Sequence, residues 1–132
     1  MRIMIDTNIL VSAIFFPKSQ VAQVLTFIMQ NHTVVLSSYV LDELISVTKR
    51  KFPEKKEAIE MFLANTAYEF VYTLDDMPED IVSIRDLKDY PVIYTAIREQ
   101  VDILITGDKD FTDIDIESPE IINPSEFKQK YM

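Results

Sequence analysis

The chain opens with Arg2-Ile3-Met4-Ile5-Asp6-Thr7-Asn8, in which an apolar run ends abruptly at a carboxylate. Residues 2–6 have the composition of a buried strand, because short apolar runs bounded by polar turn residues fill the interior of parallel sheets. A second run, Ile103-Leu104-Ile105, ends in the same way at Thr106-Gly107-Asp108, which contains the only glycine of the chain. Two strands that each end near an aspartate predict an α/β sheet with acids at one edge.

Helical and extended patterns alternate along the rest of the chain. Residue spacing predicts helices over 8–16, from Ser19 to about Met29, from Ser37 or Ser38 to about Arg50, from Pro53 to about Thr66, from Tyr90 to Gln100 and after Pro124. Extended runs predict strands at 33–36, 70–74 and 121–122, whereas 81–87 fits neither pattern. Helices between strands imply a mostly parallel sheet covered on both faces, and we expect one domain over residues 1–132.

Composition excludes several classes of function. The chain has no cysteine, which rules out thiolate metal sites and cysteine nucleophiles and makes the cytoplasm the expected location. No apolar run approaches the length of a membrane span, so we expect no membrane partner. The single His32 excludes a multi-histidine zinc site. The net charge of −9 argues against binding of nucleic acid through bulk charge, although cations at an acidic site would cancel part of it.

Asp6 and Asp108 are the strongest candidates for a functional site. Each follows a predicted strand, and open α/β sheets form their clefts beyond the carboxyl ends of the strands. Thr7 and Asn8 could orient Asp6 by hydrogen bonding, or either one could cap the following helix. Gly107 permits a tight turn or the close approach of a ligand. The alternative is that Asp6 is itself a helix cap and Asp108 an ordinary turn acid.

Glu43 and Asp89 are predicted to join the same edge of the sheet. Helical spacing places Glu43 beside the buried side of its helix, whereas its neighbour Asp42 faces water. Asp89 comes just before the helix that begins near Pro91 and leans toward the packed face of that helix. The alternatives are a glutamate whose tip reaches water and an acid favoured by the helix dipole. We prefer Asp89 to Asp86, which we treat as peripheral.

Carboxylates gathered at strand ends repel one another unless a cation lies among them. Oxygen ligands from several acids suit Mg²⁺ or Mn²⁺, and a metal at a cleft indicates phosphate chemistry. Asp110 is a weaker additional candidate beside Asp108, and Lys109 is a candidate phosphate contact because it adjoins the site. One glycine cannot form a glycine-rich phosphate loop, so the sequence excludes Walker-type nucleotide hydrolysis and dinucleotide binding.

Four segments resemble the PIN-domain family, in particular the VapC-like toxins of prokaryotic toxin–antitoxin pairs. The segments are Met1-Arg2-Ile3-Met4-Ile5-Asp6-Thr7-Asn8-Ile9-Leu10-Val11-Ser12, Leu41-Asp42-Glu43-Leu44, Arg85-Asp86-Leu87-Lys88-Asp89-Tyr90-Pro91-Val92 and Asp102-Ile103-Leu104-Ile105-Thr106-Gly107-Asp108-Lys109-Asp110-Phe111. Their order and spacing agree with the family from the first residues to Phe111. The first and last segments are together specific, and the other two are weak alone.

The resemblance implies a three-layer α/β/α fold whose five-stranded parallel sheet has the order 3-2-1-4-5. It implies a metal-dependent endoribonuclease, a hydrolase that cleaves RNA through a metal-activated water. Carried over by position, Asp6, Glu43, Asp89 and Asp108 form a catalytic, metal-binding quartet, which Thr106 and Asn8 support. The cofactor would be Mg²⁺ or Mn²⁺, the substrate RNA, and the partner a cognate antitoxin. A homodimer is a further expectation, since the apolar helices exceed what one small core needs.

Two other interpretations of the acids stay open. A metal-dependent phosphatase would also use an aspartate after the first strand, but it usually needs a second acid two residues later, where this chain has Asn8. A non-enzymatic acidic interaction module would use the carboxylates only as caps and surface charges. The basic residues of 49–51 and 55–56 could hold RNA backbone, although a solvated turn explains them better.

Overall fold

The computed structural model describes residues 1–78, 81–84, 87–111 and 114–132, and five parallel strands in these residues form one sheet. The strands are β1 (Arg2–Ile5), β2 (Thr33–Ser37), β3 (Glu69–Val71), β4 (Ile103–Ile105) and β5 (Glu120–Ile122). Their spatial order is β3-β2-β1-β4-β5, which confirms the predicted order. The strand order reverses at β1, so β1 and β4 border the position where such sheets place their clefts.

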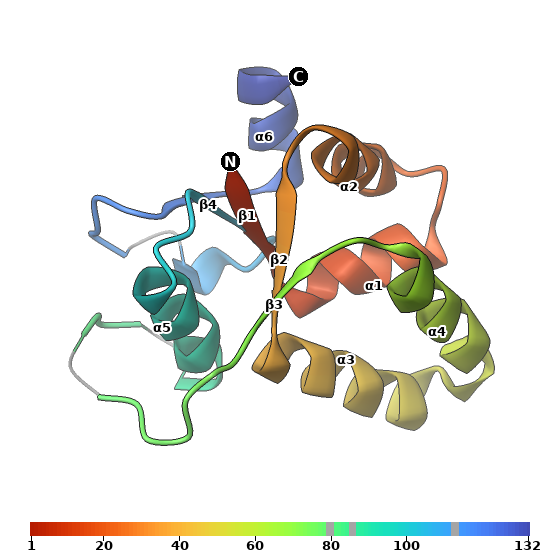
Figure 1. Ribbon diagram of the computed structural model, residues 1–132, viewed down its shortest axis with the longest axis horizontal. Coiled ribbons are helices and arrows are strands. Elements are labelled where there is room, and N and C mark those ends of the chain that lie inside the picture. Colours follow the sequence, from red (N-terminus) through yellow and green to blue (C-terminus); the bar gives the residue numbers. More distant parts are fainter. Residues whose placement is uncertain (79–80, 85–86, 112–113) are drawn as a thin grey trace.

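Helices cover both faces of the sheet, which confirms the α/β/α architecture. The α-helices are α1 (Thr7–Phe15), α2 (Gln20–Asn31), α3 (Ser38–Lys51), α4 (Lys56–Asn65), α5 (Tyr90–Arg98) and α6 (Pro124–Tyr131). Short 3-10 turns are η1 (Pro53–Lys55), η2 (Leu87–Asp89) and η3 (Lys109–Phe111). In Figure 1, α5 lies on one side of the sheet, and α1, α2 and α4 lie on the other. The helix α3 starts directly at the end of β2.

The central strands supply the core. Ile3, Met4 and Ile5 of β1 are fully buried, and so are Leu104 and Ile105 of β4. A strand covered by helices on both faces has no solvent side, so each residue in it can be apolar. This explains why Ile3-Met4-Ile5 and Ile103-Leu104-Ile105 are continuous apolar runs rather than alternating ones, and why the chain becomes polar immediately after each of them.

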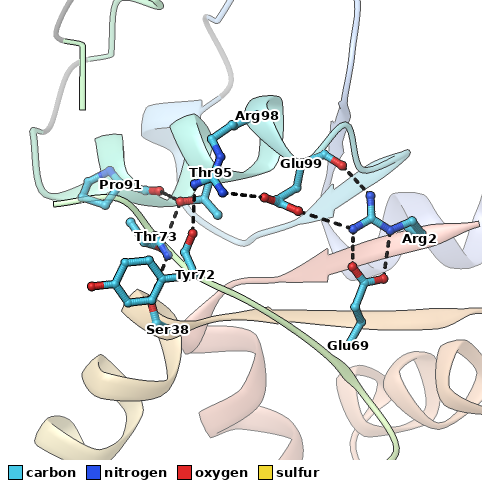
Figure 2. Close-up of polar contacts among 9 residues, drawn as sticks. All are labelled: Arg2, Ser38, Glu69, Tyr72, Thr73, Pro91, Thr95, Arg98 and Glu99. Carbon is cyan, nitrogen blue, oxygen red and sulfur yellow. Dashed lines mark hydrogen bonds and ion pairs between the residues drawn. The ribbon is translucent and has the colours of Figure 1, made fainter. Parts of the chain in front are cut away.

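The third strand ends at Val71 and not at residue 74 as predicted. Its partner β2 ends at Ser37, the residue paired with Val71, because Ser37 caps α3 and the chain turns into that helix. The exposure of residues 70–74 still alternates as in a strand. Beyond Val71, hydrogen bonds that involve side chains take the place of the backbone pairing between strands. The amide of Thr73 donates to Ser38 Oγ at 2.9 Å, and the hydroxyls of Thr73 and Thr95 hydrogen bond at 2.9 Å (Figure 2).

The ambiguous segment 81–87 is only partly described. Residues 81–84 carry neither helix nor strand, and η2 begins at Leu87. Residues 85 and 86 lie outside the described residues, so Asp86 is not placed. In the described chain, no single helix is long and apolar enough to cross a membrane, and only α1 and α2 taken together, bent by 107°, meet that length and composition.

An ion-pair cluster holds the amino end of the sheet. Arg2 of β1 hydrogen bonds to both carboxylate oxygens of Glu69 in β3 and reaches Glu99 beyond α5 (Figure 2). Arg98 pairs with Glu99 at 3.0 Å and donates to the carbonyl of Tyr72 at 3.0 Å. The hydrogen bond from Arg2 lowers the pKa of Glu69. The cluster therefore ties α5 to the sheet at the end opposite Asp6.

Replacing Met4 with alanine should lower the free energy of unfolding by about 2–5 kcal/mol, because it leaves a cavity in the fully buried central strand. The matched control is Met61→Ala, since Met61 is 63% exposed and its loss should change stability by less than about 0.5 kcal/mol. Urea unfolding of both variants measures the difference. Equal destabilisation would contradict the placement of β1 at the centre of the core.

Candidate metal centre

Asp6 lies at the junction of β1 and β4. Its amide donates to the carbonyl of Ile105 at 3.0 Å, which continues the parallel pairing by one residue beyond the strand. Its carboxylate is almost fully buried and is held at both oxygens: Oδ1 accepts from the amide of Thr7 at 2.8 Å, and Oδ2 accepts from the hydroxyl of Thr106 at 2.8 Å. The position of this carboxylate is therefore determined by two elements that are distant in sequence.

Asp6 is also the N-cap of α1, so the prediction that Asn8 or Thr7 caps this helix is wrong. The backbone of Asp6 is still extended, with φ −75° and ψ 157°, and its side chain reaches an amide at the start of the helix. Thr7 already lies inside the helix and is buried, and its Oγ1 has no hydrogen-bond partner among the described residues. Asn8 is exposed.

Burial raises the pKa of Asp6 above its ordinary value. The hydrogen bonds from Thr106 and Thr7 act in the opposite direction, and the negative charges of Glu43 and Asp108 raise the pKa further. These two acids are therefore within electrostatic reach of Asp6. An ionised Asp6 costs free energy in this position, and a bound cation would offset that cost.

Asp108 follows β4 in a turn that its own side chain stabilises. Its amide donates to Thr106 Oγ1 at 3.1 Å, and its Oδ1 accepts from the amide of Asp110 at 2.9 Å. Thr106 thus contacts both Asp6 and the backbone of Asp108. Gly107 does not have a positive φ, and a Cβ at this position would lie 3.9 Å from Ile9 Cδ1, an ordinary contact. The turn itself therefore does not require glycine, and the predicted ligand approach stays a prediction.

Three carboxylates come within ligand distance of one another. One oxygen each from Asp89, Asp108 and Asp110 lies within 4.8 Å of the others, and all three residues are half-buried. Asp89 occupies the N-cap position of α5 but makes no capping hydrogen bond with its side chain. We call Asp89, Asp108 and Asp110 the aspartate trio. It joins the N-cap of α5 to the segment after β4.

Glu43 lies on the predicted side of α3. It is half-buried, whereas Asp42 is exposed. Its charge acts on Asp6, but neither Glu43 nor Asp6 belongs to the aspartate trio. The described acids thus form two overlapping groups. In the first, the charges of Glu43 and Asp108 act on Asp6. The second is the trio, whose oxygens lie close together. Asp108 is common to both.

The family model for the PIN domain matches residues 2–110. The chain belongs to the PIN-domain family. A chain in the crystal structure of VapBC2 from Rickettsia felis, bound to a DNA fragment from their promoter, is 25% identical, with a TM-score of 0.68 over 93% of this chain and 98% of that one. A chain in DNA-bound VapBC from Salmonella typhimurium is 19% identical and has a TM-score of 0.67 over 94% of this chain and 98% of that one. No curated protein matches.

The donor set of this PIN domain fits a hard divalent cation. The trio offers only carboxylate oxygens, which are the ligands that Mg²⁺ and Mn²⁺ prefer. Ligand oxygens that surround one such ion at about 2.0–2.2 Å must lie within about 4.4 Å of one another, and the oxygens of the trio lie within 4.8 Å of one another. Asp6 is a further, buried carboxylate, and its raised pKa shows that a nearby positive charge would stabilise its ionised form.

Two residues that the sequence ranks below the four acids make hydrogen bonds to them in the structure. Asp110, the weaker candidate by sequence, belongs to the trio. The signal was its spacing of two residues from Asp108 after a strand, which suits an aspartate turn. Thr106 entered only through the family resemblance, although a hydroxyl directly after a buried strand, opposite another strand that ends in an acid, is a natural donor to that acid.

Replacing Asp6 with asparagine should stabilise the metal-free PIN domain near neutral pH. The folded-state pKa of Asp6 is raised, so its ionisation lowers stability as pH rises from the unfolded pKa, about 3.9, through the folded value. Asparagine has no such ionisation and keeps an acceptor for the amide of Thr7. Melting temperatures of both proteins in EDTA, from about pH 4 to about pH 7, should therefore diverge as pH rises.

Asp42→Asn is the matched control, because Asp42 is an exposed acid on α3. Its melting temperature should stay close to that of the native chain over the same pH range. If the difference in melting temperature between Asp6→Asn and the native chain did not change with pH, burial of a charged Asp6 would not be the cause of the destabilisation.

Proposed function

We propose that this PIN domain is a metal-dependent endoribonuclease and the toxin of a toxin–antitoxin pair. The observation that carries the proposal is the aspartate trio, whose oxygens lie within 4.8 Å beside the buried Asp6. Membership of the PIN-domain family supports a nuclease, and the likeness to chains of VapBC toxin–antitoxin complexes supports the toxin assignment. We retain a cytoplasmic location as part of the proposal.

Asp6, Glu43, Asp89 and Asp108 would hold Mg²⁺ or Mn²⁺, with Asp110 as an additional ligand. When bound, the cation makes a water more acidic and offsets the negative charge that develops on the phosphate. Asp108 would be the central ligand, because it is common to both groups of acids. Thr106 would keep Asp6 and the turn of Asp108 in fixed relation, since its hydroxyl contacts both.

The remaining residues of the site have distinct proposed tasks. Glu43 lies outside the trio but within electrostatic reach of Asp6, so it would complete the set of acids around the cation on the side of Asp6. Lys109 is exposed beside Asp108 and is the candidate phosphate contact. No protein nucleophile is needed, which agrees with a chain that has no cysteine and whose single His32 ends α2 at the amino side of β2.

An apolar hollow on the side of the sheet away from α5 supports an antitoxin partner. It measures about 430 Å³ between α1, α2 and α4, and its lining includes Leu25, Met29, Met61 and Phe62. Met61 is 63% exposed. An amphipathic helix of an antitoxin could cover Met29 and Met61, which are otherwise exposed to water. A homodimer is a further prediction.

Incubating the native chain with pooled RNA should give cleavage with Mn²⁺ or Mg²⁺ and none with EDTA. Asp108→Asn should lower the rate by at least about 100-fold, because it removes a charge shared by both groups of acids. Glu57→Gln is the matched control, because Glu57 is exposed on α4 and belongs to neither group of acids, and it should cleave at close to the native rate. Full activity of Asp108→Asn would contradict the assignment.

Mn²⁺ should also raise the melting temperature of the native chain in a saturable way, and this shift should be lost in Asp108→Asn. A non-enzymatic acidic module would show no saturable shift. A metal-dependent phosphatase would bind Mn²⁺ but would release inorganic phosphate from phosphomonoesters and leave internal RNA bonds intact. These two measurements separate the nuclease from both alternatives.

A further inference from the structure

We propose that a cavity between α3 and α5, walled by Tyr39 and Tyr72, binds one unpaired nucleobase of single-stranded RNA. The cavity has a volume of about 230 Å³, and Leu74, Met77 and Pro91 complete its apolar wall. Pockets for drug-sized ligands begin at about 300 Å³, so this one suits a single flat ring system. The inference rests on the proposed nuclease function and concerns how that site selects its substrate.

One hydrogen bond and two short sequence separations relate the cavity to the acidic site. The hydroxyl of Tyr39 donates to the carbonyl of Lys88 at 3.0 Å, and Lys88 is the residue before Asp89. Pro91 lies two residues after Asp89, and Asp42 of the cavity precedes Glu43. A nucleotide whose phosphate meets the cation at the aspartate trio would therefore have this cavity beside it for the base of a neighbouring nucleotide.

Tyr72 combines an exposed ring with a fixed backbone. Its side chain is 52% exposed, yet its carbonyl accepts from Arg98 at 3.0 Å. The next residue, Thr73, is buried and bonded to Ser38 on α3 and to Thr95 on α5, as Figure 2 shows. An aromatic ring on an ordered backbone loses little conformational freedom when a base stacks on it. Such rings form the stacking surfaces of proteins that bind single strands.

The charge of the lining selects a base rather than a phosphate. Asp42 and Asp75 line the cavity, and the residues that the structure describes there include no lysine or arginine. The hydroxyl of Tyr72 donates to Asp75 Oδ2 at 3.4 Å, a long bond that keeps the two side chains together. Carboxylates accept hydrogen bonds from the amino groups of adenine, cytosine and guanine, which uracil lacks. The cavity should therefore prefer an amino-bearing base to uracil.

The first test compares the cleavage of single-stranded RNA by three variants. Tyr72→Ala should raise KM by about 5-fold to 100-fold, the range expected for loss of one base–aromatic stack, with kcat nearly unchanged. Tyr72→Phe keeps the ring and should stay near the native KM. Phe70→Ala is the matched control, because Phe70 is 55% exposed on β3, two residues before Tyr72, but does not line the cavity. Equal effects of Tyr72→Ala and Phe70→Ala would overturn the proposal.

The second test needs neither metal nor cleavage. Adenosine or cytidine added to the metal-free native chain should shift the ring resonances of Tyr39 and Tyr72 saturably at millimolar concentration, and uridine should shift them less. Unshifted rings in a chain that cleaves RNA would overturn the base site and leave the nuclease proposal intact. Saturable shifts in a chain that cleaves no RNA would support the base site and overturn the nuclease proposal.

Discussion

The buried contact between Asp6 and Thr106 organises the functional end of this PIN domain. It places a carboxylate oxygen and a hydroxyl 2.8 Å apart just beyond the paired ends of β1 and β4. Both residues follow buried apolar runs of neighbouring strands, so their separation is determined by the strand register, in which Ile5 pairs with Ile105. Because Thr106 also accepts from the amide of Asp108, one hydroxyl relates the acid of β1 to the turn that carries the trio.

This arrangement is unfavourable without a cation. Asp6 is buried, its pKa is raised by that burial, and two further acids act on it. Folding nevertheless brings these charges together, because the strands that carry them are the most buried part of the core. Local destabilisation of this kind is characteristic of functional sites, where stability is given up for a preformed ligand set. The apolar core on both sides of the sheet supplies the compensating free energy.

Helix α5 connects the core to the site, because ion pairs hold its carboxyl end and the acids of the trio lie at its amino end. At its carboxyl end, the cluster of Arg2, Glu99 and Arg98 ties the helix to the sheet. At its amino end, Asp89 faces the other acids of the trio. Between them, the buried Thr95 hydrogen bonds to Thr73, so the segment after β3 packs along the helix. The wall of the proposed base cavity is a consequence of this packing.

Short-range pattern alone determined the class of fold, the helices and the placement of Asp6 and Asp108 at strand ends, because burial on two faces demands continuous apolar runs and polar turns follow them. The family resemblance added the strand order. Tertiary structure decided what depends on distant partners. Strand β3 stops at Val71 because β2 ends at Ser37. Asp6 caps α1 while it bonds to Thr106, and Asp110 lies close to Asp89 in the aspartate trio. Residues 89 and 110 meet only after the sheet has brought α5 beside β4, and no local spacing encodes that distance.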